Sequence, residues 1–162
     1  MDGTLLARTL LEAEGYLELG MFDESARTLA TLPSSVQSSR EVLELRAALH
    51  MTAKHWAAAA EITACLVERE PAESSWWVNF AYCVRRARSL DEAEAILLRA
   101  VELHPDNATI HYNLACYACV TGRLELAKER LAVARKLDKN VERMAMFDDD
   151  LFALRDWIEA EC

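Results

Sequence analysis

The sequence predicts an all-helical protein built from repeated helix pairs. Apolar residues recur at steps of three and four, over two stretches of about fourteen residues in each period. A small residue returns every 34 positions, a large residue follows nine positions after it, and a second small residue keeps the same register. These three columns are Ala13, Ala47, Ala81 and Ala115; Phe22, Trp56, Leu90 and Leu124; and Ser25, Ala59, Ala93 and Ala127.

The composition suits a compact helical protein and excludes several other classes. The chain of 162 residues is 52% hydrophobic with four glycines and three prolines, which excludes disordered and collagen-like proteins. Its net charge of −9 argues against nucleic-acid binding, because phosphates require a basic face. No uncharged apolar stretch approaches the length of a membrane span, so we expect no membrane insertion. Five irregularly spaced cysteines, without a secretion signal at the N-terminus, indicate a reduced, cytoplasmic protein.

The first repeat, residues 6–39, is expected to be a shortened N-terminal cap. Pro33 interrupts its second helix, because proline cannot donate the backbone hydrogen bond that a helix interior needs. The polar segment PSSVQSS then connects to Arg40, which begins the second repeat over residues 40–73.

The third and fourth repeats cover residues 74–107 and 108–141. In the third repeat, Ser89 and Glu92 form an S-x-x-E capping box that begins the second helix. In the fourth, the N-cap candidates are Asp106 and Asn107. The turn between the two helices of a repeat favours a left-handed residue. In the four repeats this position is occupied by Gly20, Lys54, Arg88 and Gly122.

The repeat pattern stops after Lys139, and residues 148–161 are expected to form a capping helix. Three acids at its start suit the positive end of a helix dipole, and an apolar stripe follows them. We expect this stripe to cover the open face of the fourth repeat. Alternatively, the stripe is exposed for a partner or a second copy of the chain. It consists of Leu151, Leu154, Trp157 and Ile158.

The 34-residue length and the three columns resemble the tetratricopeptide repeat over residues 6 to about 140. The third repeat is the clearest copy, with Trp77, Phe80, Ala81, Ala93, Ala100 and Pro105. The resemblance implies a right-handed superhelical solenoid of helix-turn-helix units, forming a single domain over residues 1–162. It also implies that the first helices line a concave groove that holds a peptide from a protein partner.

The groove residues implied by the resemblance lie on one face of each first helix, at three- and four-residue steps. We therefore expect a partner segment to contact Leu45, Met51, Asn79, Tyr82, Arg85, Arg86, Tyr112, Asn113 and Cys116.

Two pairs of groove residues suggest what the partner is. Asn79 and Asn113 are one repeat apart, and their amides offer a donor and an acceptor to an extended backbone. The alternative is that they cap or bridge neighbouring helices. Arg85 and Arg86 suit a carboxylate, which favours an acidic or C-terminal peptide segment. In the alternative, these arginines form a solvated helix end and pair with Asp91, Glu92 or Glu94.

Cys116 and Cys119 form a C-x-x-C motif, which raises the possibility of thiol or metal chemistry. No second C-x-x-C exists to complete a zinc site, and Cys116 lies in mid-helix, away from the helix start that activates redox thiols. We therefore expect no catalytic residue, no metal and no cofactor.

The sequence predicts a non-enzymatic protein–protein interaction module. One alternative is a small bacterial secretion-type chaperone with tetratricopeptide repeats, which homodimerisation through the irregular first repeat would favour. Another is a thiol or metal protein that uses Cys116 and Cys119. A chain trimmed from something larger is also compatible with the sequence.

Overall fold

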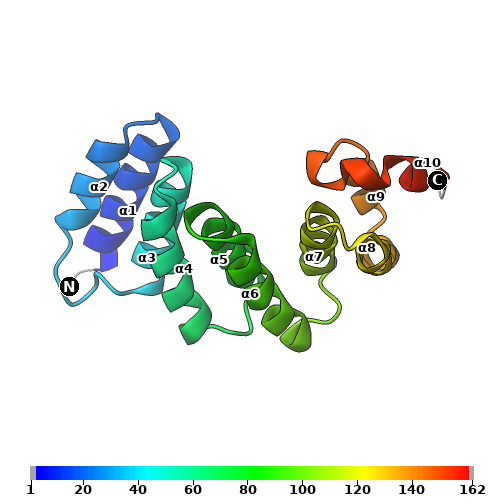
Figure 1. The fold of residues 1–162 in the computed structure, drawn as a ribbon. Coiled ribbons are helices and arrows are strands. Elements are labelled where there is room, and N and C mark those ends of the chain that lie inside the picture. The colour runs from blue at the N-terminus through cyan, green and yellow to red at the C-terminus, as the bar shows by residue number, and fades with distance from the viewer. Residues whose placement is uncertain (1–2, 161–162) are drawn as a thin grey trace. The chain divides into compact units, whose positions relative to one another are not determined.

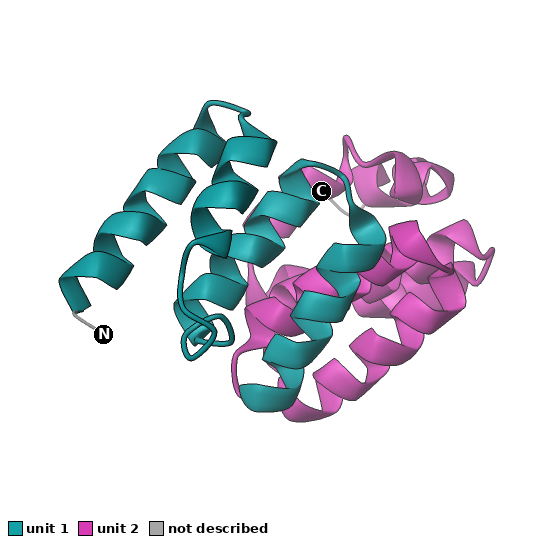
Figure 2. Ribbon diagram, turned by 90° about the vertical axis from the view of Figure 1, so that its left-hand side faces the viewer, with its two compact units in different colours: residues 1–71 teal, residues 72–162 magenta. Residues whose placement is uncertain are grey.

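The computed structural model describes residues 3–160, and in that range it contains only helices and connecting turns (Figure 1). Adjacent helices pack in pairs, so the prediction of an all-helical chain of helix pairs is confirmed. The helices are α1 Gly3–Glu18, α2 Phe22–Ala30, α3 Arg40–Thr52, α4 Trp56–Arg69, α5 Ser74–Ala87, α6 Leu90–Leu103, α7 Ala108–Val120, α8 Leu124–Leu137, α9 Asn140–Ala145, the 3₁₀ helix η1 Asp149–Leu154 and α10 Arg155–Ala160. The chain divides into two compact units, residues 1–71 (unit 1) and 72–162 (unit 2) (Figure 2).

Unit 1 contains the hairpins α1–α2 and α3–α4. Ala13 and Ala47 are fully buried, because two helices approach closely only where the side chain is small. Ser25 is also fully buried, and its hydroxyl donates to the carbonyl of Ala13 at 2.8 Å. This bond links α1 to α2, and it explains how serine replaces alanine in that column without leaving a buried hydroxyl unpaired.

The connection between α2 and α3 is held by side chains. The chain leaves α2 at Ala30, before Pro33. The amide of Gln37 then donates to the carbonyls of Leu29, at 3.0 Å, and Leu32, at 2.7 Å. Arg46 of α3 donates to the amide oxygen of Gln37. The polar loop is therefore tied to both helices that it joins, and the half-buried Arg46 stands where a tetratricopeptide repeat usually carries leucine.

The turns within the hairpins follow the predicted conformation in three of four cases. Gly20, Lys54 and Gly122 are left-handed, with φ of 72°, 59° and 77°. Arg88 has φ of −135° instead. The reason is that α5 runs on to Ala87 and Ser89 caps α6 at once, accepting from the amide of Glu92 at 3.2 Å.

In unit 2, α5–α6 and α7–α8 form the third and fourth hairpins, and α7 is the most deeply buried helix of the four. The N-cap of α7 is Asn107, whose side chain accepts from the amide of Ile110 at 3.0 Å. The same side chain donates to the hydroxyl of Ser74 at 2.9 Å. One residue therefore begins α7 and links its start to the start of α5.

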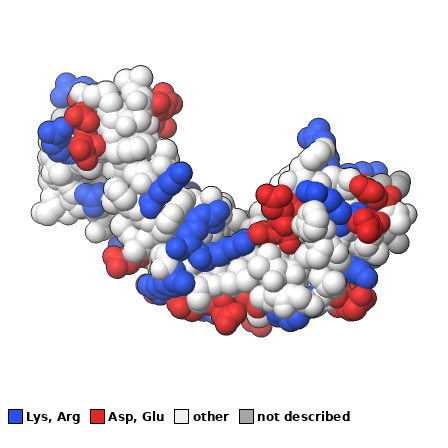
Figure 3. All heavy atoms as spheres, turned by 45° about the horizontal axis from the view of Figure 1, so that its top comes forward, with Lys and Arg blue, Asp and Glu red and all other residues white. Residues whose placement is uncertain are grey.

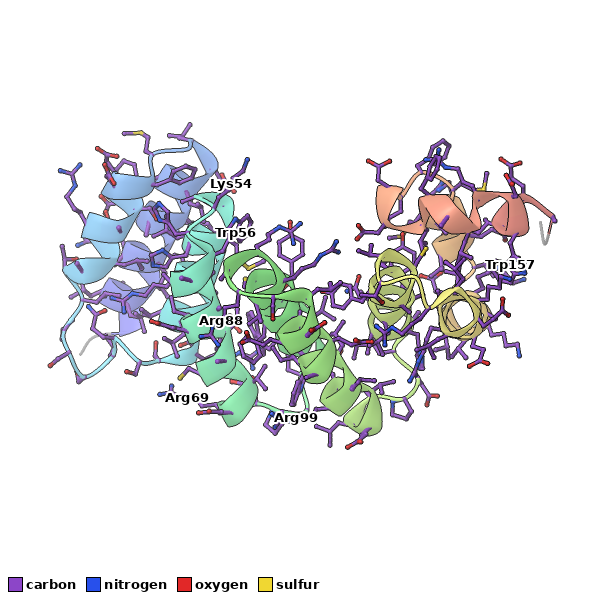
Figure 4. The ribbon with its side chains drawn as sticks, viewed as in Figure 1. Lys54, Trp56, Arg69, Arg88, Arg99 and Trp157 are labelled. Carbon is purple, nitrogen blue, oxygen red and sulfur yellow. The ribbon has the colours of Figure 1, made fainter. Side chains whose placement is uncertain are left out.

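The C-terminal segment differs from the single capping helix expected over residues 148–161. After α9, this C-terminal segment (residues 146–160) forms the 3₁₀ helix η1 and the short helix α10, and η1 packs mainly on α7. Leu151, Leu154 and Ile158 are buried, whereas Trp157, which extends from α10 (Figure 4), is half-buried. The expected helix end at residue 161 lies outside the described residues.

Throughout residues 3–160, no helix combines the length and the apolar character needed to cross a bilayer.

Candidate functional site

The outward face of α5 carries three of the predicted groove residues in one stripe. Asn79, Tyr82 and Arg86 follow one another at steps of three and four, which places them on the same side of the helix. The Tyr82 side chain is 40% exposed, and the guanidinium of Arg86 lies 3.4 Å from the centroid of its ring. This stacking holds the cation over the aromatic face and presents both groups at the surface.

The amides of Asn79 and Asn113 are half-buried on α5 and α7. Neither side chain makes a hydrogen bond to another residue in the range 3–160. The alternative in which they cap or bridge helices therefore has no bond to support it in that part of the chain. A half-buried amide without a partner keeps its donor and acceptor capacity for a ligand backbone.

A second set of predicted groove residues is in contact with the C-terminal segment. Arg85 forms a two-point ion pair with Asp150, with Nη1 to Oδ2 at 2.5 Å and Nη2 to Oδ1 at 2.9 Å. The hydroxyl of Tyr112 donates to Asp148 at 2.6 Å, and the thiol of Cys116 lies 3.7 Å from the same oxygen. The carboxylate partner of Arg85 is thus Asp150, and not one of the three acids of α6 considered in the sequence analysis. Adjoining basic and acidic side chains are visible on the surface in Figure 3.

Two of those acids have other partners. Glu92 pairs with Arg88 at 3.5 Å, and Glu94 pairs with Arg123 at 2.8 Å.

Burial under the C-terminal segment changes the chemistry of α7. Tyr112 and Cys116 are 6% and 3% exposed, so both are covered. Burial raises the pKa of Tyr112, and its hydrogen bond to Asp148 raises it further. Burial also raises the pKa of Cys116, with the negative charges of Asp148 and Asp150 adding to the effect. The predicted groove residues that still face outward in unit 2 are Asn79, Tyr82, Arg86 and Asn113.

The buried thiols are poorly placed for redox chemistry. Burial raises the pKa of Cys119 as well as that of Cys116, whereas a reactive cysteine needs a lowered pKa. Cys116, Asp148 and Asp150 each bring one donor atom within 4.8 Å of the others, which is close enough to suggest a metal site. However, the hydrogen bonds from Tyr112 and Arg85 already engage both carboxylates and account for this convergence.

The predicted residues of unit 1 lie in a different chemical setting. Leu45 lines a hollow of about 290 Å³ between α1 and α3, whereas Met51 is half-buried elsewhere on α3. Three carboxylates and no basic side chain are among its lining residues, so this hollow disfavours an acidic ligand. The other lining residues are Leu10, Glu14, Glu41, Glu44 and Ala48.

The contribution of the C-terminal segment to this surface was not predicted from the sequence. A signal was present, because Asp148, Asp149 and Asp150 directly precede the apolar stripe while Arg85 and Arg86 are adjacent on α5. Opposite charges on the two segments could have suggested their pairing.

The comparisons with known proteins agree with this description of the fold. Residues 96–129 match the tetratricopeptide repeat family, a stretch as long as the 34-residue period of the sequence. Among solved structures, MamA AMB-1 aligns with 80% of this chain and 76% of its own, with 18% identity and a TM-score of 0.66. A double mutant of MamA RS-1 aligns with 82% and 74%, with 15% identity and a TM-score of 0.67. MamA MSR-1 aligns with 82% and 76%, with 18% identity and a TM-score of 0.63.

At these identities the likeness shows a common fold. The sequence has no significant match among curated proteins.

Proposed function

We propose that this chain, which is a tetratricopeptide-repeat protein, is a non-enzymatic interaction module that binds an extended segment of a partner protein on the α5–α7 face of unit 2. The observation that carries the proposal is the pair of half-buried amides, Asn79 and Asn113, that bond to no other described residue. Asparagine side chains accept and donate to a peptide backbone without reading its sequence. They therefore suit a surface that holds a segment in an extended form.

The charges of unit 2 favour a partner segment with a carboxylate. Arg86 is exposed and stacked on Tyr82, where a carboxylate gains a charge-assisted hydrogen bond and the ring offers flat contact area. Unit 1 does not share this preference, because the hollow that Leu45 lines is walled by Glu14, Glu41 and Glu44. We therefore assign an acidic or C-terminal segment to unit 2 alone.

The state of the cysteine thiols supports the proposal of a non-enzymatic role and a cytoplasmic location. Cys65, Cys116 and Cys119 form no disulfide in the described part of the chain, which suits a reducing compartment. The raised pKa values of Cys116 and Cys119 disfavour the thiolate that a thiol enzyme requires.

The experiment starts with affinity capture from the source cell and mapping of the bound partner to a short segment. That segment is then titrated calorimetrically against the natural chain and against a variant that combines Asn79→Ala with Asn113→Ala. We expect the double variant to bind at least about tenfold more weakly, with its melting temperature nearly unchanged. A matched control is Asn140→Ala, which removes an amide from the start of α9. Equal affinity for the double variant and the natural chain would remove these amides from the binding site.

A second candidate role, that of a chaperone working as a homodimer, has one supporting observation in unit 1. Leu11 of α1 and Leu19, which directly follows α1, are 70% and 75% exposed, and exposed leucines close together on a surface favour self-association. Sedimentation equilibrium of the natural chain and of a Leu11→Ser, Leu19→Ser variant tests it. A monomer at all concentrations would eliminate this candidate.

A further inference from the structure

A hollow of about 670 Å³ opens in unit 2 beside the stripe of Asn79, Tyr82 and Arg86. Its volume falls within the range of sites that bind small molecules or a few side chains. The C-terminal segment and α9 form most of its wall, with α5 and α7 supplying the rest. The lining residues are Arg85, Arg86, Tyr112, Met144, Phe147, Asp148, Asp149 and Asp150.

The apolar residues of this wall are exposed, and the packing of the C-terminal segment does not depend on them. The Phe147 side chain is 82% exposed and Met144 is 54% exposed, although both are large and apolar. The segment itself is held by Leu151 and Leu154, which are fully buried. Phe147 and Met144 are thus not needed to anchor the segment, and together they present a contact surface for an apolar side chain.

The charged side chains of the wall differ in how exposed they are. Asp150 accepts from Arg85 and Asp148 accepts from Tyr112, so these four groups are held within the protein. Arg86, which also donates to the carbonyl of Tyr82 at 3.3 Å, and Asp149, which lies 3.9 Å from Arg155, are exposed at the rim. The rim therefore offers a cation on the α5 side and an anion on the side of the C-terminal segment.

We propose that this hollow anchors one large apolar side chain of the partner, flanked by an aspartate or glutamate. The apolar side chain packs on Phe147 and Met144, and the carboxylate is bound by Arg86. Asp149 repels a second carboxylate on its own side, so the acidic flank of the segment must face α5. This inference rests on the proposed function, and it names the class of partner: an acidic segment that carries a leucine, methionine or aromatic residue.

The C-terminal segment, which lies outside the repeats, thereby gives the surface its side-chain selectivity. The amides of Asn79 and Asn113 hold any extended backbone, whereas the hollow distinguishes one side chain from another. Backbone binding and side-chain selection are therefore separable by mutation.

The experiment uses a phage library of random dodecapeptides, selected on the full chain. We expect the selected peptides to carry a large apolar residue next to an aspartate or glutamate. Phe147→Ser and Arg86→Gln should each lower the affinity of a selected peptide by about tenfold. Two matched controls lie outside the hollow: Phe152→Ser, at a phenylalanine that is 66% exposed, and Arg88→Gln, at an exposed arginine next to α5. They should change the affinity by less than about twofold.

The outcomes separate this inference from the proposed function. If selected peptides lack the apolar–acidic pair, or keep their affinity for Phe147→Ser and Arg86→Gln, the hollow is not the anchor. If those peptides still lose affinity for the chain with Asn79→Ala and Asn113→Ala, the proposed function stands without the inference. If binding depends neither on Phe147 and Arg86 nor on the two asparagines, or if no peptide is selected, both the inference and the proposed function are overturned. Circular dichroism checks that each variant is folded, which the exposure of Phe147 and Arg86 leads us to expect.

Discussion

Arg85 of α5 and Asp150 of η1, which are 65 residues apart in the chain, form a two-point ion pair at 2.5 and 2.9 Å. The pair joins the third repeat to the segment that follows the fourth. The hydrogen bond to Asp150 raises the pKa of Arg85, and its guanidinium also lies 5.1 Å from the ring of Tyr117 in α7. One arginine thus connects α5, α7 and the C-terminal segment.

Removing the charge of Asp150 should loosen the C-terminal segment. Both side chains of the pair are 28% exposed, so solvent screens part of the attraction. We expect Asp150→Asn to lower the free energy of unfolding by about 1 kcal/mol in urea denaturation. Asp149→Asn is the control, because its side chain is 102% exposed and should contribute nothing measurable. Equal effects of the two substitutions would show that the ion pair does not hold the segment.

The apolar contacts of the same segment should matter more than its charges. Leu154 is 1% exposed, and Leu154→Ala leaves a cavity that should cost about 2–4 kcal/mol of unfolding free energy. Phe152, two residues earlier, is 66% exposed, and Phe152→Ala should stay within about 0.5 kcal/mol. Urea denaturation compares the two. A small effect at Leu154 would mean that η1 is not packed on α7 in solution.

Cys116 should react slowly with thiol reagents. Its pKa is raised by burial and by the charges of Asp148 and Asp150, so its thiolate is scarce as well as covered. At pH 8 we expect iodoacetamide to label it at least about tenfold more slowly than free cysteine. Leu151→Ala, which weakens the covering segment, should speed the labelling. Mass spectrometry assigns the labelled residue. Rapid labelling of Cys116 in the natural chain would restore the thiol-enzyme alternative.

His50 should make unit 1 less stable in mild acid. Burial lowers its pKa from 6.5, and the positive charges of His55 and Arg46 lower it further. Below about pH 6.5 the unfolded chain therefore binds a proton that the folded chain does not, so stability falls as the pH drops through that value. His50→Gln removes this proton uptake and should flatten the fall in urea midpoint between pH 7.5 and 5.5. The same fall in both proteins would assign the effect to other groups.

The helix pairs were predictable because the requirement for small residues at helix crossings repeats in the sequence itself. Ala13, Ala47, Ala81 and Ala115 are all buried as that requirement demands. The prediction for Arg88 was wrong. Helix α5 continues to Ala87, directly before Arg88, and Ser89 then caps α6, so no left-handed position remains between the two helices. That change depends on local helix length, which a fixed 34-residue period does not contain.

The C-terminal segment and the site were harder to predict for a different reason. Leu151 and Leu154 are three residues apart, a spacing that fits a 3₁₀ helix as well as an α-helix, so the pattern did not distinguish them. The positions of Asn79, Tyr82 and Arg86 on one face followed from helical periodicity. Helical periodicity did not predict the partners of Arg85 and Tyr112. These partners, Asp150 and Asp148, lie in a segment outside the repeats, and no periodic pattern places such a segment.

The most direct test of the central claim is a map of where a captured partner segment touches the chain. Backbone amide shifts of the ¹⁵N-labelled protein are recorded as the segment is added. Binding on the α5–α7 face should give the largest changes at Asn79, Tyr82, Arg86 and Asn113, with small changes on α6 and α8. Largest changes on α6 and α8, or in unit 1 alone, would contradict the account.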